Sequence, residues 1–81
     1  MKIIKFAASW CQPCKMLSKM IEGEDLGAPV EEVDIDENVD LAKQYNIRGV
    51  PTMVLVDDEG KEVKRISGVQ NAKELRAHFG L

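Results

Sequence analysis

The sequence has few cysteines and histidines, no cluster of basic residues and no long apolar run. Its 81 residues include two cysteines and one histidine. Two cysteines separated by two residues are not the framework of a disulfide-stapled secreted domain. Basic residues are not clustered and the net charge is −3, which argues against nucleic acid as the default partner. Apolar runs such as residues 53–56 are too short to cross a bilayer, so we expect no membrane partner.

The sequence also lacks internal repeats, low-complexity tracts and a visible secretory signal. A chain of 81 residues supports one core, and an apolar content of 44% is ordinary for a globular protein. We therefore expect a single domain over residues 1–81. The cytoplasm is the expected location, although a mature periplasmic form with its signal removed would look the same.

Hydrophobic periodicity divides the chain into four strands and three helices. The expected strands cover residues 2–8, 30–36, 52–56 and 62–67, and the expected helices cover residues 11–22, about 38–46, and a last segment that opens at a capping box at 71–74. Met16 and Met20 are expected in the core, and His78 is expected to be exposed with no catalytic role.

The order β-α-β-α-β-β-α implies a parallel pair of strands with a right-handed crossover, followed later by an antiparallel hairpin. The expected fold is therefore α/β, with one mixed four-stranded sheet flanked by three helices. The acidic segment 31–36 suits an edge of this sheet, where like charges discourage pairing with a second molecule. We accordingly expect a monomer.

Cys11 and Cys14 carry the candidate chemistry. Residues three apart are neighbours on a helix surface, so these two cysteines can form a disulfide in the first turn, where Pro13 also fits. A thiolate on Cys11 would accept the unpaired N–H groups of the helix N-terminus, whose partial positive charge lowers the pKa of that thiol below its usual value of about 8.5. Lys15 adds a positive charge nearby. The spacing predicts thiol–disulfide exchange in which Cys11 attacks and Cys14 resolves the mixed disulfide.

The same Cys-x-x-Cys pair is also half of a zinc site. A closed zinc site needs four ligands, and beyond these two thiols only His78 remains, more than sixty residues away. Zinc would then require a dimer or carboxylate ligands. The placement of the two cysteines after an expected strand and before an expected helix favours redox chemistry.

Two segments carry a family resemblance. Residues 6–15, Phe-Ala-Ala-Ser-Trp-Cys-Gln-Pro-Cys-Lys, and residues 47–52, Ile-Arg-Gly-Val-Pro-Thr, resemble the active-site turn and the middle of the thioredoxin family, and the likeness runs over nearly the whole chain. The resemblance implies a protein disulfide reductase with no cofactor beyond its redox disulfide, acting in electron transport and cell redox homeostasis. A partner reductase or glutathione would supply the electrons. It also implies that Pro51 is cis and faces the disulfide, with substrate contacts at Trp10, Val50, Pro51 and Gly68.

The sequence departs from the family pattern in three ways. It lacks the N-terminal strand and helix of ordinary thioredoxins, which makes it nearer to glutaredoxin in size. Gln12 replaces the usual glycine. Lys5 and Glu32 stand where the family has an aspartate and a lysine, so the two charges are exchanged. If these side chains lie side by side beneath Cys14, Glu32 or a neutral Lys5 is a candidate acceptor for the Cys14 proton; the plainer interpretation is a swapped structural pair.

The leading prediction is thus a dithiol reductase of protein disulfides that works with a thioredoxin reductase. An alternative within the same chemistry is a glutaredoxin-like protein recycled by glutathione. An alternative from another class is a thioredoxin-fold binding subunit of a larger enzyme, in which the thiols are incidental.

Overall fold

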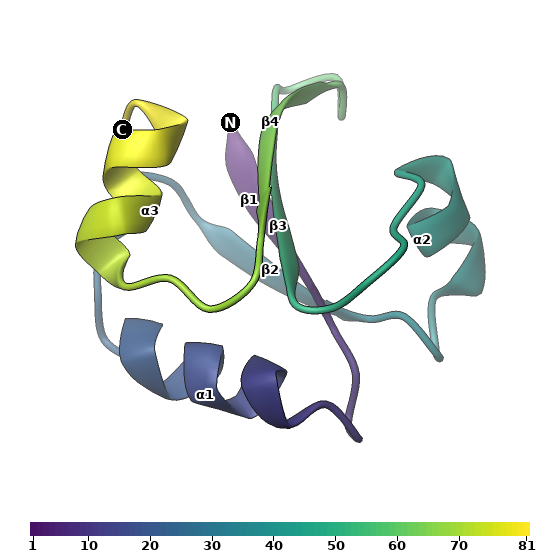
Figure 1. The fold of residues 1–81 in the computed structure, drawn as a ribbon. Helices are drawn as coiled ribbons and strands as arrows, with labels where there is room; N and C mark the ends of the chain where they lie inside the picture. The colour runs from purple at the N-terminus through teal and green to yellow at the C-terminus, as the bar shows by residue number, and fades with distance from the viewer.

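Seven elements follow one another as β1-α1-β2-α2-β3-β4-α3 in the computed structural model, which describes residues 1–81 (Figure 1). The strands are β1 (Lys2–Ala7), β2 (Val30–Asp34), β3 (Thr52–Val56) and β4 (Glu62–Ser67), and the helices are α1 (Gln12–Ile21), α2 (Val39–Gln44) and α3 (Ala72–Phe79). The expected order is confirmed, and the bounds of β3 and β4 match the expected ones. None of the helices is both long and apolar enough to cross a bilayer.

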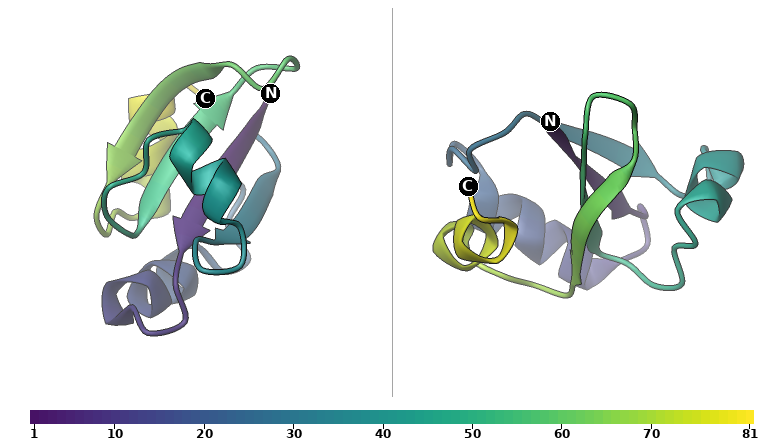
Figure 2. Two further views of the ribbon diagram at one scale, coloured as in Figure 1. Left: turned by 90° about the vertical axis from the view of Figure 1, so that its right-hand side faces the viewer. Right: turned by 90° about the horizontal axis from the view of Figure 1, so that it is seen from above.

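The four strands form one mixed sheet in the order β2-β1-β3-β4. β1 is parallel to β2 and antiparallel to β3, and β3 is antiparallel to β4 in a hairpin (Figure 2). The acidic strand β2 lies at an edge, as its charge pattern predicts. The sheet therefore places β1 and β3 in the centre, where both can be covered on two faces.

Helices α1 and α3 cover one face of the sheet, and α2 covers the other (Figure 1). The core on the α1 and α3 side consists of Ile3, Leu17, Leu26, Met53, Leu55, Ala72, Leu75 and Phe79. The core on the α2 side consists of Ile4, Phe6, Val33, Tyr45, Val54 and Val56. All five residues of β3 are buried, which explains why its sequence is apolar without alternation.

Helix α3 is fixed at both ends by local bonds. The Asn71 side chain accepts from the Glu74 N–H at 2.8 Å, and the Glu74 carboxylate accepts from the Asn71 N–H at 3.4 Å, so the expected capping box is present. Gly80 ends the helix with a φ of 72° in the left-handed region, which glycine adopts without strain. Leu75 and Phe79 are buried against the sheet, as predicted.

Arg65 of β4 connects three elements. Its guanidinium donates to the Tyr45 carbonyl and forms an ion pair with Glu62 at 2.6 Å, and this contact lowers the pKa of the Glu62 carboxyl. The Arg65 carbonyl lies 2.8 Å from Nε2 of His78 on α3. His78 is half-buried there, so the expectation of an exposed histidine was wrong. The ring is held between β4 and α3, and the helical periodicity alone did not reveal this contact.

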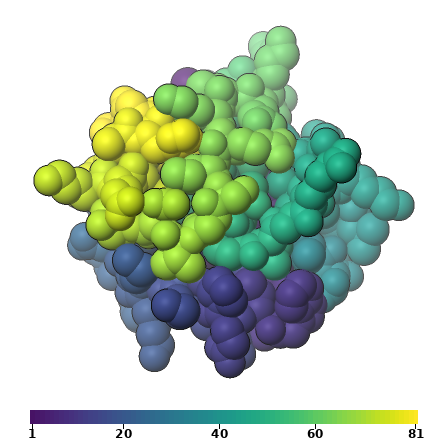
Figure 3. Space-filling view, viewed as in Figure 1, coloured from purple at the N-terminus to yellow at the C-terminus, as the bar shows by residue number.

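Helix α1 buries only Cys14 and Leu17. Met16 is 58% exposed and Met20 is 44% exposed, so the expectation that both belong to the core was wrong. The reason is the position of α1 at the end of the molecule, with no other element over its outer side (Figure 3). The apolar residues of α1 do fall at helical spacing, but the side of the helix with Leu17 faces the sheet and the side with Met16 and Met20 faces outward.

Two neighbouring residues of α1 test this assignment. Leu17→Ala removes a fully buried side chain, and we expect it to lower the free energy of unfolding by about 2–5 kcal/mol. Met16→Ala truncates an exposed side chain, and we expect a change within about 0.5 kcal/mol. Urea denaturation of the oxidised proteins measures both. Similar losses for the two variants would contradict the exposed placement of Met16.

Candidate functional site

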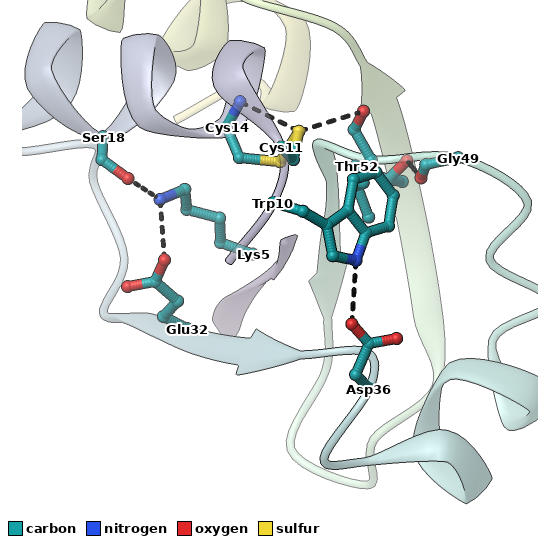
Figure 4. The surroundings of a disulfide bond; sticks show 10 residues. Lys5, Trp10, Cys11, Cys14, Ser18, Glu32, Asp36, Gly49 and Thr52 are labelled. Carbon is teal, nitrogen blue, oxygen red and sulfur yellow. Dashed lines mark hydrogen bonds and ion pairs between the residues drawn. A yellow bond between two sulfur atoms is a disulfide. The ribbon is translucent and has the colours of Figure 1, made fainter. Parts of the chain in front are cut away.

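The two cysteines lie at the junction of β1 and α1 and form a disulfide, with their Cα atoms 5.3 Å apart (Figure 4). Cys11 is the N-cap of α1 with an extended backbone, and its Sγ accepts from the Cys14 N–H at 3.1 Å. This is the cap expected from the sequence, with sulfur in place of the usual oxygen. Pro13 lies in the first turn, where its missing N–H costs nothing. The disulfide is nearly closed to solvent, because Cys11 is 4% and Cys14 3% exposed.

The segment before β3 packs against the disulfide. The Sγ of Cys11 lies 3.8 Å from the carbonyl oxygen of Val50, a contact drawn as a dashed line from this sulfur in Figure 4. The Val50–Pro51 peptide bond is cis, as the family resemblance implied. The Thr52 hydroxyl donates to the Gly49 carbonyl at 2.7 Å and fixes this turn. Val50 therefore packs against the disulfide, and the cis bond joins it to Pro51 at the start of the segment that leads into β3.

Gly68 reaches the same region from the end of β4. Its N–H donates to the carbonyl of Pro51 at 3.0 Å. Its φ of 90° lies in the left-handed region, so a larger residue there would be strained. The structure thus joins the backbones of Gly68 and Pro51.

Trp10 lies directly before Cys11 and is 66% exposed. Its indole Nε1–H donates to Oδ2 of Asp36 at 2.9 Å (Figure 4). Sequence analysis placed Asp36 only in the acidic segment 31–36 expected at the sheet edge, and it missed this contact. A signal was present: the carboxyl ends of the parallel strands β1 and β2 meet at one end of the sheet, and Trp10 and Asp36 follow those two ends.

Lys5 points from β1 toward α1, on the same side of the sheet as the disulfide (Figure 4). Lys5 is only 3% exposed; its Nζ donates to the Ser18 hydroxyl and pairs with Glu32 at 3.1 Å. Lys5 and Glu32 are direct partners in the parallel register of β1 and β2, so both side chains project from the same face. The expected pair is present. Ser18 was missed, although its place four residues after Cys14 puts the two on one helix face.

A pocket of about 230 Å³ opens beside the second cysteine. Its lining residues are Ala7, Ala8, Ser9, Cys14, Lys15, Ser18, Glu32 and Asp34. Cys14 therefore lines this pocket together with Ser18 and Glu32, the two residues that contact Lys5, whereas Cys11 does not line it. No group of three or more His, Cys, Asp or Glu side chains in residues 1–81 is arranged to hold a metal ion.

Known proteins resemble this chain in sequence and in fold. The thioredoxin family model matches residues 1–80. A thioredoxin of Chlamydia trachomatis is 40% identical over 76 residues, which cover 90% of this chain and 74% of the relative. Thioredoxin H2 of Arabidopsis thaliana is 41% identical over 71 residues, covering 84% of this chain and 53% of the relative. The structure of a mutant thioredoxin from Halobacterium salinarum superposes with a TM-score of 0.81 at 42% identity, covering 93% of this chain and 67% of that one.

The contact between Trp10 and Asp36 can be tested by fluorescence, because Trp10 is the single tryptophan. Asp36→Ala removes the acceptor of the indole N–H, so we expect the ring to rotate more freely and its steady-state anisotropy to fall. The free energy of unfolding should stay within about 0.5 kcal/mol of the parent, since both side chains are exposed. Glu37→Ala, which removes the adjacent exposed carboxylate, is the control. Equal anisotropy in all three proteins would show that Asp36 does not hold the ring.

Proposed function

This chain belongs to the thioredoxin family and is a thiol–disulfide oxidoreductase, and we propose that Cys11 is its nucleophile and Cys14 its resolving thiol. The single observation that carries this assignment is the capping of α1 by the Cys11 sulfur, which accepts the Cys14 N–H. In the reduced protein, the same N–H group and the positive end of the helix stabilise a thiolate on Cys11 by about 0.3–2 kcal/mol. Cys14, inside the first turn, lacks this position.

The proposed reaction has two exchange steps. The Cys11 thiolate attacks one sulfur of a substrate disulfide, forming a mixed disulfide and releasing the other substrate sulfur as a thiolate. The Cys14 thiolate then attacks Sγ of Cys11, which forms the Cys11–Cys14 disulfide and releases the second substrate thiolate. Two electrons pass to the substrate, and its two sulfurs take up protons from solvent. No cofactor beyond the protein's own disulfide takes part.

Substrate contacts are proposed at Trp10, Val50, Pro51 and Gly68. The exposed indole of Trp10 offers an apolar surface beside Cys11. The Val50 backbone adjoins the Cys11 sulfur, so an extended peptide could bond to it while presenting its disulfide. The bond from Gly68 to Pro51 keeps the neighbouring loop close to this segment. We propose that these four residues together form the surface on which the substrate peptide lies beside Cys11.

Lys5 and Glu32 are proposed as the proton-transfer candidates for Cys14. Glu32 and Cys14 border the same pocket, and the Glu32 side chain is 63% exposed, so protons can pass between it and solvent. Glu32 is the better acceptor of the two, because it is a carboxylate in contact with the pocket while Lys5 is enclosed.

Protein disulfides are the proposed substrates, and a flavoprotein thioredoxin reductase is the proposed electron donor. The proposed location of the protein is the cytoplasm. We propose that the protein acts as a single-domain monomer over residues 1–81, in electron transport for cell redox homeostasis. The thioredoxin relatives support the reductase; a glutaredoxin-like protein or a binding subunit is not favoured by these comparisons.

Single-cysteine variants test the assignment of roles. Cys14→Ser keeps the nucleophile and removes the resolving thiol, so we expect it to accumulate a covalent adduct with insulin chains that dithiothreitol releases. Cys11→Ser should form little adduct, because its remaining thiol lacks the N-cap position. Mass spectrometry of the mixtures measures both. Adduct formation by Cys11→Ser as extensive as by Cys14→Ser would reverse or remove the proposed roles.

The electron donor is tested separately with the oxidised wild-type protein. We expect NADPH and a thioredoxin reductase to reduce it and to sustain insulin reduction, measured by the loss of NADPH absorbance. Glutathione with glutathione reductase and NADPH is the matched arm, and we expect it to be much slower. Faster reduction by glutathione would favour the glutaredoxin-like alternative. The double variant Cys11→Ser, Cys14→Ser gives the background rate.

A further inference from the structure

The two cysteines are almost equally buried, but different surroundings cover them. Cys11 is 4% exposed and Cys14 is 3% exposed, so exposure alone gives neither sulfur an advantage toward an incoming thiol. The Cys11 sulfur lies 3.8 Å from the Val50 carbonyl oxygen, whereas Cys14 lines the pocket of about 230 Å³, which Cys11 does not line. Figure 4 shows Cys14 on the side of Ser18 and the Cys11 sulfur on the side of Thr52. Open space therefore adjoins the disulfide on the Cys14 side.

The pocket has room for a small molecule. Its volume of about 230 Å³ is several times the share of about 30 Å³ that one water molecule takes in the liquid. Ala7 and Ala8 give it apolar walls, and the same two residues pack against the disulfide. A molecule of a few heavy atoms therefore fits this space and lies next to Cys14.

The charges around the pocket do not exclude an anion. Lys15, Glu32 and Asp34 line it, and Lys5 bonds to Ser18 and Glu32 beside it. These two positive and two negative side chains cancel formally, and solvent screens the exposed ones. This matters because the attacking species in disulfide exchange is a thiolate.

The leaving sulfur also favours attack on Cys14. A thiolate that attacks Sγ of Cys14 releases Cys11, and a thiolate that attacks Sγ of Cys11 releases Cys14. Exchange is faster when the released thiolate is the more stable one. Cys11 is the N-cap of α1, where the Cys14 N–H and the positive end of the helix stabilise its thiolate. Access and leaving group thus agree on Cys14 as the sulfur that a small thiol attacks.

We propose that this pocket binds a low-molecular-weight monothiol, which reduces the disulfide by attacking Sγ of Cys14. Each monothiol gives its proton to solvent and reacts as a thiolate. The first forms a mixed disulfide with Cys14 and releases Cys11 as a thiolate. The second attacks the sulfur of the first, which forms a disulfide of the two monothiols and releases Cys14, whose sulfur takes a proton from solvent. Two monothiols thus supply the two electrons.

The inference goes beyond the proposed function, because it gives the oxidised protein a second route of reduction that needs no partner protein. It rests on the proposed function in one respect, the greater stability of the Cys11 thiolate. Protein substrates still react at Cys11, beside Val50, while small thiols enter on the opposite side of the disulfide.

The test uses the oxidised wild-type protein and 2-mercaptoethanol, sampled early in the reduction. Acid protonates the thiolates and stops exchange, and denaturation with N-ethylmaleimide then labels every free thiol equally. Fragment mass spectrometry of the peptide that holds both cysteines locates the mercaptoethanol adduct. We expect an excess of about 2- to 30-fold on Cys14 over Cys11, the factor by which a helix N-terminus favours an anion. A smaller excess, or adduct mainly on Cys11, would overturn the inference.

A pocket variant tests the route of entry. Ser9 is exposed and lines the pocket, so Ser9→Leu places a larger side chain in the lining. We expect reduction by 2-mercaptoethanol to slow several-fold in this variant. Gln44→Leu makes the same kind of change at an exposed site of α2, which covers the other face of the sheet, and it should keep the wild-type rate. An unchanged rate in Ser9→Leu, with the fold checked by circular dichroism, would reject the pocket as the route.

The adduct experiment with Cys14→Ser tests the proposed function apart from the pocket, because it starts from the Cys11 thiolate of the reduced protein. Trapping by Cys14→Ser together with a mercaptoethanol adduct mainly on Cys11 would reject the pocket route alone. Absence of trapping would reject the proposed role of Cys11 and, with it, the argument from the leaving sulfur.

Discussion

The bond from the Cys14 N–H to the Cys11 sulfur is the interaction on which the site depends. The first turn of a helix has N–H groups without partners inside the helix, and one of them here meets a sulfur rather than an oxygen. The cap that begins α1 and the redox group are therefore the same atom. Because the Cys11 side chain must turn back to cap the helix, it also lies within reach of Cys14 and against Val50.

Strand β1 positions both sides of this centre. It pairs with β2 on one side and β3 on the other, so its register is fixed twice. Alternation along the strand directs Ile4 and Phe6 toward the α2 side and Lys5 toward α1. Ala7, at the end of the strand, packs against the disulfide. One buried strand thus supports the sulfur atoms and carries the charged group beneath them.

Local patterns in the sequence were sufficient to predict the order of the strands and helices, the capping box at Asn71 and the position of the two cysteines at the start of α1. Each of these features depends on residues within one or two turns of each other. Such patterns were insufficient where two elements must be placed relative to each other. The apolar spacing along α1 predicted that Met16 is buried, but this spacing could not show that no other element packs over Met16. Trp10 bonds to Asp36, and Lys5 bonds to Ser18. The two residues of each pair are far apart in the sequence, and only the register and packing of the elements bring them together.

The low exposure of the Cys11 sulfur restricts which targets the protein can reach. With Cys11 only 4% accessible in the disulfide form and its sulfur against the Val50 carbonyl, we expect an incoming disulfide to be carried on an extended, flexible segment of chain. A disulfide locked inside a tightly folded target has no such stretch until part of that target loosens. The protein would then discriminate among targets by how readily each one opens locally, more than by the side chains around its disulfide. The rate at which a compact target is reduced would depend on how often that target opens.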